Sequence, residues 1–318
     1  MGTPNDVPHL AAQAQAFVAQ QRYAEALPLF ERALTLQPAS VYLLRETAAA
    51  LTSLRRYQEA LEVANRILAL NPQDGNAWRF KAFSLANMGR DNEAIPAFGQ
   101  AQKFLPEGDA AWYETMRNQA LCLRRNHRSA EALNVVDRTL ASATLSQETR
   151  GNLLGIKGAC LRDLNRTAEA FAAFDQGLAL APKDAGTLHE NLLALIFAHR
   201  WSDAIAIGAR LVALDSANAG DWALYSTALD EAGKWQQALS AIDKAIGLNL
   251  NDPTLHYNRA IVLLHLNHER DAVQALDRAI GLNPNYGQAW LVKSKVLAAV
   301  GRRKEAQEAE RRAKSLGM

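Results

Sequence analysis

One residue pattern recurs along this chain at an interval of 34 residues, and it constrains the fold more than any other feature. Residues 275–285 read ALDRAIGLNPN, and residues 241–251 read AIDKAIGLNLN. One column of alanine extends this register through the chain: Ala26, Ala60, Ala94, Ala132, Ala170, Ala204, Ala238, Ala272 and Ala306. The step is 34 residues, except for two steps of 38. Such a repeat predicts stacked copies of one supersecondary unit.

Each copy has the pattern of two amphipathic helices joined by a short turn. Small residues recur twelve positions before the alanine column, and large apolar residues recur four positions before those. Residues that tolerate the left-handed backbone stand at the turn in seven copies: Gly89, His127, Asn165, His199, Gly233, Asn267 and Gly301. Proline, which cannot continue a helix, follows the second helix in five copies: Pro38, Pro72, Pro106, Pro182 and Pro284.

The third copy shows this register most fully, with Trp78, Ala82, Leu85, Gly89, Ala94, Phe98, Ala101 and Pro106. On these residues the chain resembles the tetratricopeptide repeat family. The resemblance implies an all-α fold, a right-handed superhelical solenoid of antiparallel helix pairs. We expect an N-terminal tail over residues 1–6 and a single solenoid over 7–318. Its nine repeats are expected at 7–40, 41–74, 75–108, 113–146, 151–184, 185–218, 219–252, 253–286 and 287–318.

Two insertions of four residues, Asp109–Trp112 and Gln147–Arg150, account for the two longer steps. Four residues make about one helical turn, so we expect longer first helices in the fourth and fifth copies. Thr144, three residues before Gln147, predicts a capping box at the start of the second of these helices.

The last copy carries Glu310 and Lys314 where other copies have apolar residues. A charged outer face is typical of the terminal repeat of a solenoid, so we expect the array to be complete.

Motifs of catalytic and phosphate-binding chemistry do not occur in the sequence, so we expect neither an enzyme nor a cofactor. His256, His265 and His268 form the one cluster that resembles a metal site, but His256 falls in a packing column, and we expect no metal. Cys122 and Cys160 share a column of small residues in adjacent copies. A free cysteine in such a column behaves as a small hydrophobe.

Composition argues against several other classes of function. The formal charge is +2 with 21% charged residues, which argues against a dedicated nucleic-acid binder. No apolar run approaches the roughly 18 residues of a membrane helix. Residues 1–10 lack the basic and then apolar pattern of a secretory signal. We therefore expect a cytoplasmic protein without nucleic-acid or membrane partners.

First-helix residues that do not repeat are the candidates for binding. The resemblance implies that first helices line a concave groove holding a peptide or a partner helix. Arg45, Arg79 and Arg117 occupy the fifth place of three consecutive copies, and Arg124 and Arg162 add a second basic row. The remaining candidates, mostly apolar, are His189, Leu193, Phe197, Tyr257, Ile261 and Leu264. Asp230 and Glu231 stand between the two apolar groups as an acidic break.

These residues support two interpretations of the groove. A basic stretch over repeats two to five and an apolar stretch over repeats six to eight would suit an acidic or carboxylate-ended peptide with hydrophobic anchors. Alternatively, the arginines are ordinary solvated charges that pair with neighbours such as Glu46 and Glu114. Some tetratricopeptide repeat proteins bind the C-termini of chaperones through a clamp of Lys and Asn side chains. This sequence does not match that clamp, since Ala49, Phe83 and Leu121 stand at the places of its asparagines.

The function that we predict is a protein-interaction scaffold or adaptor that binds a peptide or partner helix. The alternative is a regulatory or substrate-recruiting subunit, or region, of an enzyme complex.

Overall fold

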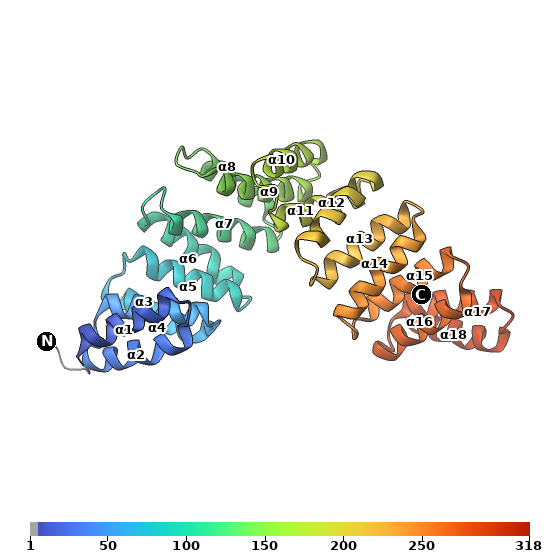
Figure 1. Ribbon diagram of the computed structural model, residues 1–318, viewed down its shortest axis with the longest axis horizontal. Helices are drawn as coiled ribbons and strands as arrows, with labels where there is room; N and C mark the ends of the chain where they lie inside the picture. The colour runs from blue at the N-terminus through green and yellow to red at the C-terminus, as the bar shows by residue number, and fades with distance from the viewer. Residues whose placement is uncertain (1–5) are drawn as a thin grey trace. The chain divides into compact units, whose positions relative to one another are not determined.

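The computed structural model describes residues 6–318, and over this range all regular structure is α-helical, in 18 helices that follow one another in pairs (Figure 1). The first helices are α1 (Val7–Ala19), α3 (Val41–Ser53), α5 (Gly75–Asn87), α7 (Ala110–Arg125), α9 (Gln147–Asp163), α11 (Ala185–Phe197), α13 (Ala219–Glu231), α15 (Pro253–His265) and α17 (Gly287–Ala299). The second helices are α2 (Tyr23–Leu36), α4 (Tyr57–Leu70), α6 (Asp91–Phe104), α8 (Ser129–Leu140), α10 (Thr167–Leu180), α12 (Trp201–Leu214), α14 (Trp235–Leu248), α16 (Glu269–Leu282) and α18 (Arg303–Ser315).

A residue in the left-handed conformation stands at the turn of every pair. Gly89, His127, Asn165, His199, Gly233, Asn267 and Gly301 all have φ between 55° and 81°, which confirms the predicted turn column. Gln21 and Arg55 adopt the same conformation with φ of 59°, although their side chains disfavour it. The position in the repeat therefore determines the left-handed conformation at the turn, and Gly, Asn or His only lowers its cost. The five predicted prolines each stand two residues beyond the end of a second helix.

The two insertions lengthen first helices, as predicted. Helix α7 has 16 residues and α9 has 17, whereas the other first helices have 13.

The predicted capping box at Thr144 is wrong. Ser146 is the N-cap of α9, and its Oγ accepts the backbone N–H of Thr149 at 3.1 Å. Thr144 instead places its Oγ1 2.7 Å from the hydroxyl of Tyr113. Gln147 is already the first helical residue, so the cap must lie directly before it.

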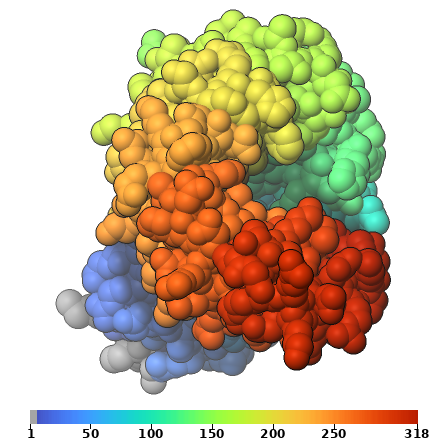
Figure 2. Space-filling view, turned by 90° about the vertical axis from the view of Figure 1, so that its right-hand side faces the viewer, coloured from blue at the N-terminus to red at the C-terminus, as the bar shows by residue number. Residues whose placement is uncertain are grey.

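The chain divides into two compact units, which we call the N-terminal unit (Met1–Arg166, described from Asp6) and the C-terminal unit (Thr167–Met318). The alanine column is buried in both. Phe30 and Phe98 are fully buried in the N-terminal unit, as is Phe174 in the C-terminal unit. In Figure 2 the side chains of the C-terminal unit form a continuous surface from yellow to red. The division falls within the fifth predicted repeat, between α9 and α10.

The predicted N-terminal tail is described only at Asp6, because residues 1–5 lie outside the described part. Asp6 is the N-cap of α1, and its side chain accepts the backbone N–H of His9 at 3.0 Å.

The last helix, α18, buries only three small residues, Ala306, Ala309 and Ala313. Glu310 and Lys314 face outward and pair with each other at 2.7 Å. The outer face of this helix is therefore charged, as the sequence predicts. Within residues 6–318, no helix combines the length and the apolar character required to cross a membrane.

Candidate functional site

Neighbouring first helices lie against one another within each unit, and this arrangement defines the candidate binding surface. In the N-terminal unit α3 contacts α5, α5 contacts α7, and α7 contacts α9. In the C-terminal unit α11 contacts α13, and α13 contacts α15. We define the first-helix surface as the residues at the fifth, ninth, twelfth and thirteenth places of each predicted repeat. All eleven candidate residues of the sequence analysis occupy these places.

Two arginines of the predicted basic row form ion pairs with the next first helix. The Nε of Arg45 donates to Oδ2 of Asp74 at 2.8 Å. Asp74 is buried, and it caps the N-terminus of α5. Arg79 reaches Glu114 on α7, at 3.2 Å. Glu114, one of the two predicted partners, therefore pairs with Arg79. Arg45 pairs with Asp74 and not with Glu46, the other predicted partner.

Arg79 is also the most enclosed member of this row. Its guanidinium lies 4.7 Å from the centre of the Phe80 ring, and its Nε is buried without a hydrogen-bond partner. Burial lowers the pKa of Arg79, and Glu114 partly opposes that shift. Such a partly desolvated cation contributes to the packing between α5 and α7 through its stem as well as its charge.

The other arginines of the N-terminal unit differ from one another in their surroundings. Arg124 and Arg162 converge on Asp163, at 2.8 Å and 3.0 Å. Burial acts to raise the pKa of Asp163, but the hydrogen bonds from the two arginines outweigh it and hold the pKa below its usual value. Arg117 is exposed on α7 and has no ion-pair partner among residues 6–318. Of the predicted basic residues, Arg117 is therefore the one whose charge the described chain leaves uncompensated.

The C-terminal unit carries the predicted apolar candidates. Leu193, Ile261 and Leu264 are half-buried on α11 and α15. Phe197 at the end of α11 is 74% exposed, the highest value among the exposed large apolar residues of the described chain. At this thirteenth place the other repeats have small, polar or charged residues: Ala19, Ser53, Asn87, Arg125, Asp163, Glu231, His265 and Ala299.

Two further aromatic candidates contact neighbouring helices. Nδ1 of His189 lies 2.7 Å from Oδ1 of the buried Asp221 at the start of α13. Tyr257 packs its ring 5.2 Å from that of Tyr286, and burial raises the pKa of Tyr257. Its phenol therefore stays neutral and can act as a hydrogen-bond donor.

One residue of the predicted acidic break on α13 contacts α15. Oδ1 of Asp230 lies 2.7 Å from Nδ1 of His265, and the His265 ring lies 5.8 Å from that of Trp235. Glu231 remains exposed beside this pair.

Sequence reasoning missed a set of contacts that join each second helix to the next first helix. Lys157 pairs with Asp137 at 2.7 Å, and Lys293 pairs with Asp277 at 2.6 Å. The equivalent contacts are Lys81 with Asn65 at 3.0 Å and Arg259 with Asp243 at 2.7 Å. The sequence contains a pattern that could have predicted these contacts. An Asp or Asn on the second helix stands 16 residues before a Lys or Arg on the next first helix in three copies, and 20 residues before it where the second insertion intervenes. We call these contacts the inter-repeat pairs. Their charged residues join neighbouring repeats, so they are not candidates for partner binding.

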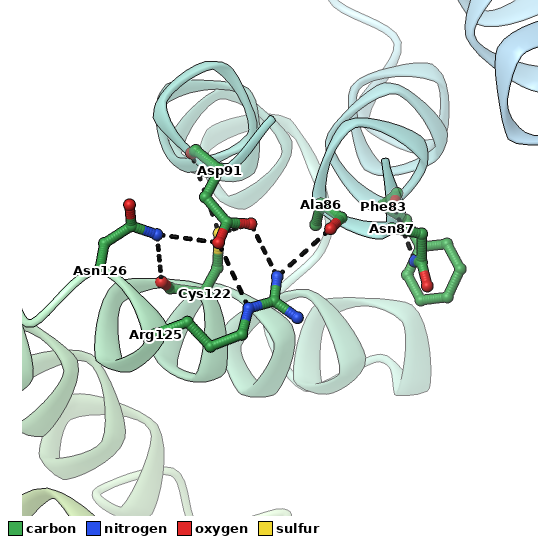
Figure 3. A network of polar contacts seen from close by, with 7 residues as sticks. All are labelled: Phe83, Ala86, Asn87, Asp91, Cys122, Arg125 and Asn126. Carbon is green, nitrogen blue, oxygen red and sulfur yellow. Dashed lines mark hydrogen bonds and ion pairs between the residues drawn. The ribbon is translucent and has the colours of Figure 1, made fainter. Parts of the chain in front are cut away.

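A second unpredicted network surrounds Cys122 (Figure 3). The Cys122 thiol donates to Oδ1 of Asp91 at 3.1 Å, and Arg125 and Asn126 donate to the same carboxylate at 2.7 Å and 2.9 Å. Burial, followed by the Asp91 carboxylate, raises the pKa of Cys122 to about 12. Burial acts to raise the pKa of Asp91 as well, but the hydrogen bonds from Arg125 and Cys122 bring it below its usual value. The thiol is thus a hydrogen-bond donor between α6 and α7, unsuited to nucleophilic chemistry.

His256 belongs to the packing of the repeat. Its Nε2 lies 3.0 Å from the carbonyl oxygen of Leu250, six residues upstream. Trp78, Trp222 and Trp290 occupy the same place in other copies and donate their indole N–H to the carbonyl six residues upstream, at 2.9–3.0 Å. Over residues 6–318, no three His, Cys, Asp or Glu side chains are grouped so that they could hold a metal ion.

Comparison with family models gives two matches. Residues 17–82 match the model described as tetratricopeptide repeat. Residues 198–279 match the model described as anaphase-promoting complex, cyclosome, subunit 3. Among curated proteins, none matches the sequence.

Solved structures resemble the fold. A chain of the structure described as the APC/C hetero-tetramer Cut9-Hcn1 superimposes with a TM-score of 0.64 at 17% identity. That match covers 91% of this chain but 55% of the other, so this chain spans about half the length of that relative. A structure of MamA protein matches with a TM-score of 0.50 and 22% identity, over 54% of this chain and 92% of that one.

Proposed function

The chain is a tandem array of tetratricopeptide repeats, and we propose that it works as a protein-interaction scaffold or adaptor without catalysis of its own. A partner peptide or helix binds to the first-helix surface, with its apolar anchors on α11 and α15. The second part of the proposal concerns charge: an acidic or carboxylate-ended segment of the partner contacts the basic residues of the N-terminal unit.

Phe197 is the observation that carries this proposal. A phenylalanine that is 74% exposed, at a place where other repeats have small, polar or charged residues, does not serve the packing of the repeat. Large aromatic side chains are enriched among the residues that dominate binding energy at interfaces. Half-buried Leu193 on the same helix extends the apolar surface beside it.

The free energies expected for apolar burial and for ion pairs indicate that the apolar residues of the first-helix surface supply most of the affinity. Burial of a phenylalanine side chain contributes about 1.5–3 kcal/mol. Exposed ion pairs contribute about 0–1 kcal/mol each, and Arg45, Arg79, Arg124 and Arg162 already have carboxylate partners in the chain. Arg117 is therefore the arginine best able to add a new pair with a partner.

Capture of partners from the host extract tests the apolar part. Phe197→Ala should lower capture of the main partner at least tenfold, because the anchor is lost. Leu248→Ala is the matched control, since Leu248 is also exposed (46%) in the same unit but ends a second helix. If Phe197→Ala and Leu248→Ala capture the partner equally well, Phe197 is not an anchor.

Charge reversal tests the basic part separately. Arg117→Glu should weaken capture several-fold while helicity by circular dichroism stays unchanged, because no ion pair of the described chain is broken. Arg45→Glu is a poorer test, since it would place a second carboxylate beside buried Asp74. Unchanged capture by Arg117→Glu would refute the acidic-partner proposal and leave the apolar part standing.

A second candidate function is a subunit of a larger enzyme complex, whose substrate or regulator it would recruit. The match of residues 198–279 to a family model described as a subunit of the anaphase-promoting complex favours it. Size-exclusion chromatography of the native extract distinguishes the two functions. Elution in a large assembly with enzymatic activity supports the subunit, and elution with one small partner supports the adaptor.

The location that we propose is the cytoplasm. Cys122 and Cys160 are both buried thiols that form no disulfide, as is typical of proteins in a reducing compartment. Fractionation of host cells tests this location.

A further inference from the structure

A pocket of about 290 Å³ lies in the N-terminal unit between α6, α7 and α8, outside the first-helix surface. Its apolar floor is small and consists of Leu105, Trp112 and Met116, which belong to one core cluster and are only 8%, 6% and 2% exposed. Trp112 is the last residue of the four-residue insertion that lengthens α7. The pocket therefore depends on a feature that most repeats of the chain lack.

Charged side chains surround this floor. Lys103 at the end of α6 and Arg138 near the end of α8 line the pocket and are exposed. Neither forms an ion pair within residues 6–318, although the Lys103 Nζ lies 5.4 Å from the centre of the Phe104 ring. Glu107 is the one acidic residue that lines the pocket. The lining thus carries one positive charge in excess, above an apolar base.

The indole of Trp112 adds a donor that has no acceptor. Its N–H makes no hydrogen bond within residues 6–318, although the residue is only 6% exposed. The indoles of Trp78, Trp222 and Trp290 each donate to a backbone carbonyl. The Trp112 N–H is not one of the buried polar atoms that lack a partner, so it remains accessible to solvent and to a ligand. Two cations and this indole therefore supply donors around the pocket, beside the Glu107 carboxylate.

We propose that this pocket binds a carboxylate carried on an apolar group. The apolar group packs on Trp112, Met116 and Leu105, and the carboxylate accepts from Arg138, Lys103 and the Trp112 indole. A guanidinium matches a carboxylate with two parallel hydrogen bonds, and indole and ammonium groups add single donors. The volume is close to the lower end of small-ligand sites, so it suits one residue or a small aryl carboxylate. The inference does not depend on the proposed function, which concerns other residues.

Titration of the whole protein with N-acetyl-phenylalanine, followed by two-dimensional NMR of the indole N–H signals, tests the proposal. The Trp112→Phe variant assigns the Trp112 signal. We expect this signal to move saturably while the signals of Trp78, Trp222 and Trp290 stay in place. The matched neutral probe, N-acetyl-phenylalanine amide, should not move it.

Variants and further probes complete the test. Arg138→Gln and Lys103→Gln should each raise the Kd at least fivefold. Arg270→Gln should leave it unchanged, because Arg270 is exposed on α16 and likewise unpaired. Inorganic phosphate should bind much more weakly, since it makes no use of the apolar floor. The spectra of all variants must retain the dispersion of the folded protein, so that loss of folding is recognised.

Three outcomes would overturn the proposal: no movement of the Trp112 signal, equal movement with the amide or with phosphate, or an unchanged Kd in both variants. A pentapeptide ending in phenylalanine with a free carboxylate identifies the source of the ligand. Tighter binding of this peptide than of N-acetyl-phenylalanine indicates the C-terminus of a protein, and equal binding indicates a small carboxylate.

Discussion

At the scale of single residues, different side chains make the same contact when the repeat demands it. The fourth place of the repeat holds Trp78, Trp222, Trp290 and His256, and each ring nitrogen reaches the carbonyl six residues upstream. The contact fixes the loop before the first helix. A histidine in such a column is therefore structural, even where nearby histidines resemble a metal site in the sequence.

Substitution of His256 tests this equivalence. His256→Phe keeps an aromatic ring but loses the hydrogen bond to Leu250, so the free energy of unfolding should fall by about 1 kcal/mol. His256→Trp can restore the donor and should lose less. Urea unfolding measures both variants, and a His256→Phe variant as stable as the parent chain would show that the contact contributes nothing.

The Asp91 network predicts a dependence of stability on pH. Hydrogen bonds hold the pKa of Asp91 below its usual value of about 3.9, so its contribution is complete above that value and is lost as pH falls through the folded-state pKa. Asp91→Asn should lower the free energy of unfolding by about 1–3 kcal/mol at pH 7. The difference between parent and variant should stay constant above about pH 5 and shrink below about pH 4. A difference that is independent of pH down to pH 2 would contradict this account.

At the scale of helices, much of the architecture could be predicted from the sequence because it depends on register. The turn column, the prolines and the longer α7 and α9 follow from spacing alone. The cap of α9 was misplaced, since Thr144 and Ser146 are both good caps and only the start of the helix selects between them. The partners of Arg45 and Arg124, Asp74 and Asp163, were also missed, because only the packing of neighbouring repeats brings them close.

The inter-repeat pairs should contribute to stability, and the pair of Asp277 and Lys293 tests this contribution. Asp277→Lys should lower the free energy of unfolding by about 0.2–1 kcal/mol, because it replaces a partly exposed ion pair by two like charges. Asp277→Lys combined with Lys293→Asp reverses the pair and should recover most of this loss. Thermal unfolding at low and high salt measures the coupling, and strictly additive effects of the two substitutions would show that the pair is not energetically coupled.

At the scale of the whole chain, the repeat accounts for packing in both units, and residues that break the repeat account for the proposed binding. Phe197 on the first-helix surface and Trp112 in the inserted turn have no counterpart in the other copies, and Arg117 differs from Arg45 and Arg79 at the same place because it has no ion-pair partner within residues 6–318. The sequence could locate Arg117 and Phe197 because they lie on first helices outside the packing columns, and it marked Trp112 only as the end of an insertion. It could not show that Arg117 lacks an ion pair or that Phe197 is exposed, since both depend on neighbouring helices.

Hydroxyl-radical footprinting of the protein with its captured main partner tests the central claim most directly. The measurement reports the solvent exposure of individual side chains, and Phe197 is highly exposed in the chain alone. We predict that oxidation of Phe197 falls at least fivefold in the complex, while Leu248 at the end of α14 is oxidised as before. Unchanged oxidation of Phe197, with protection confined to the second helices, would contradict the claim that the first-helix surface binds the partner.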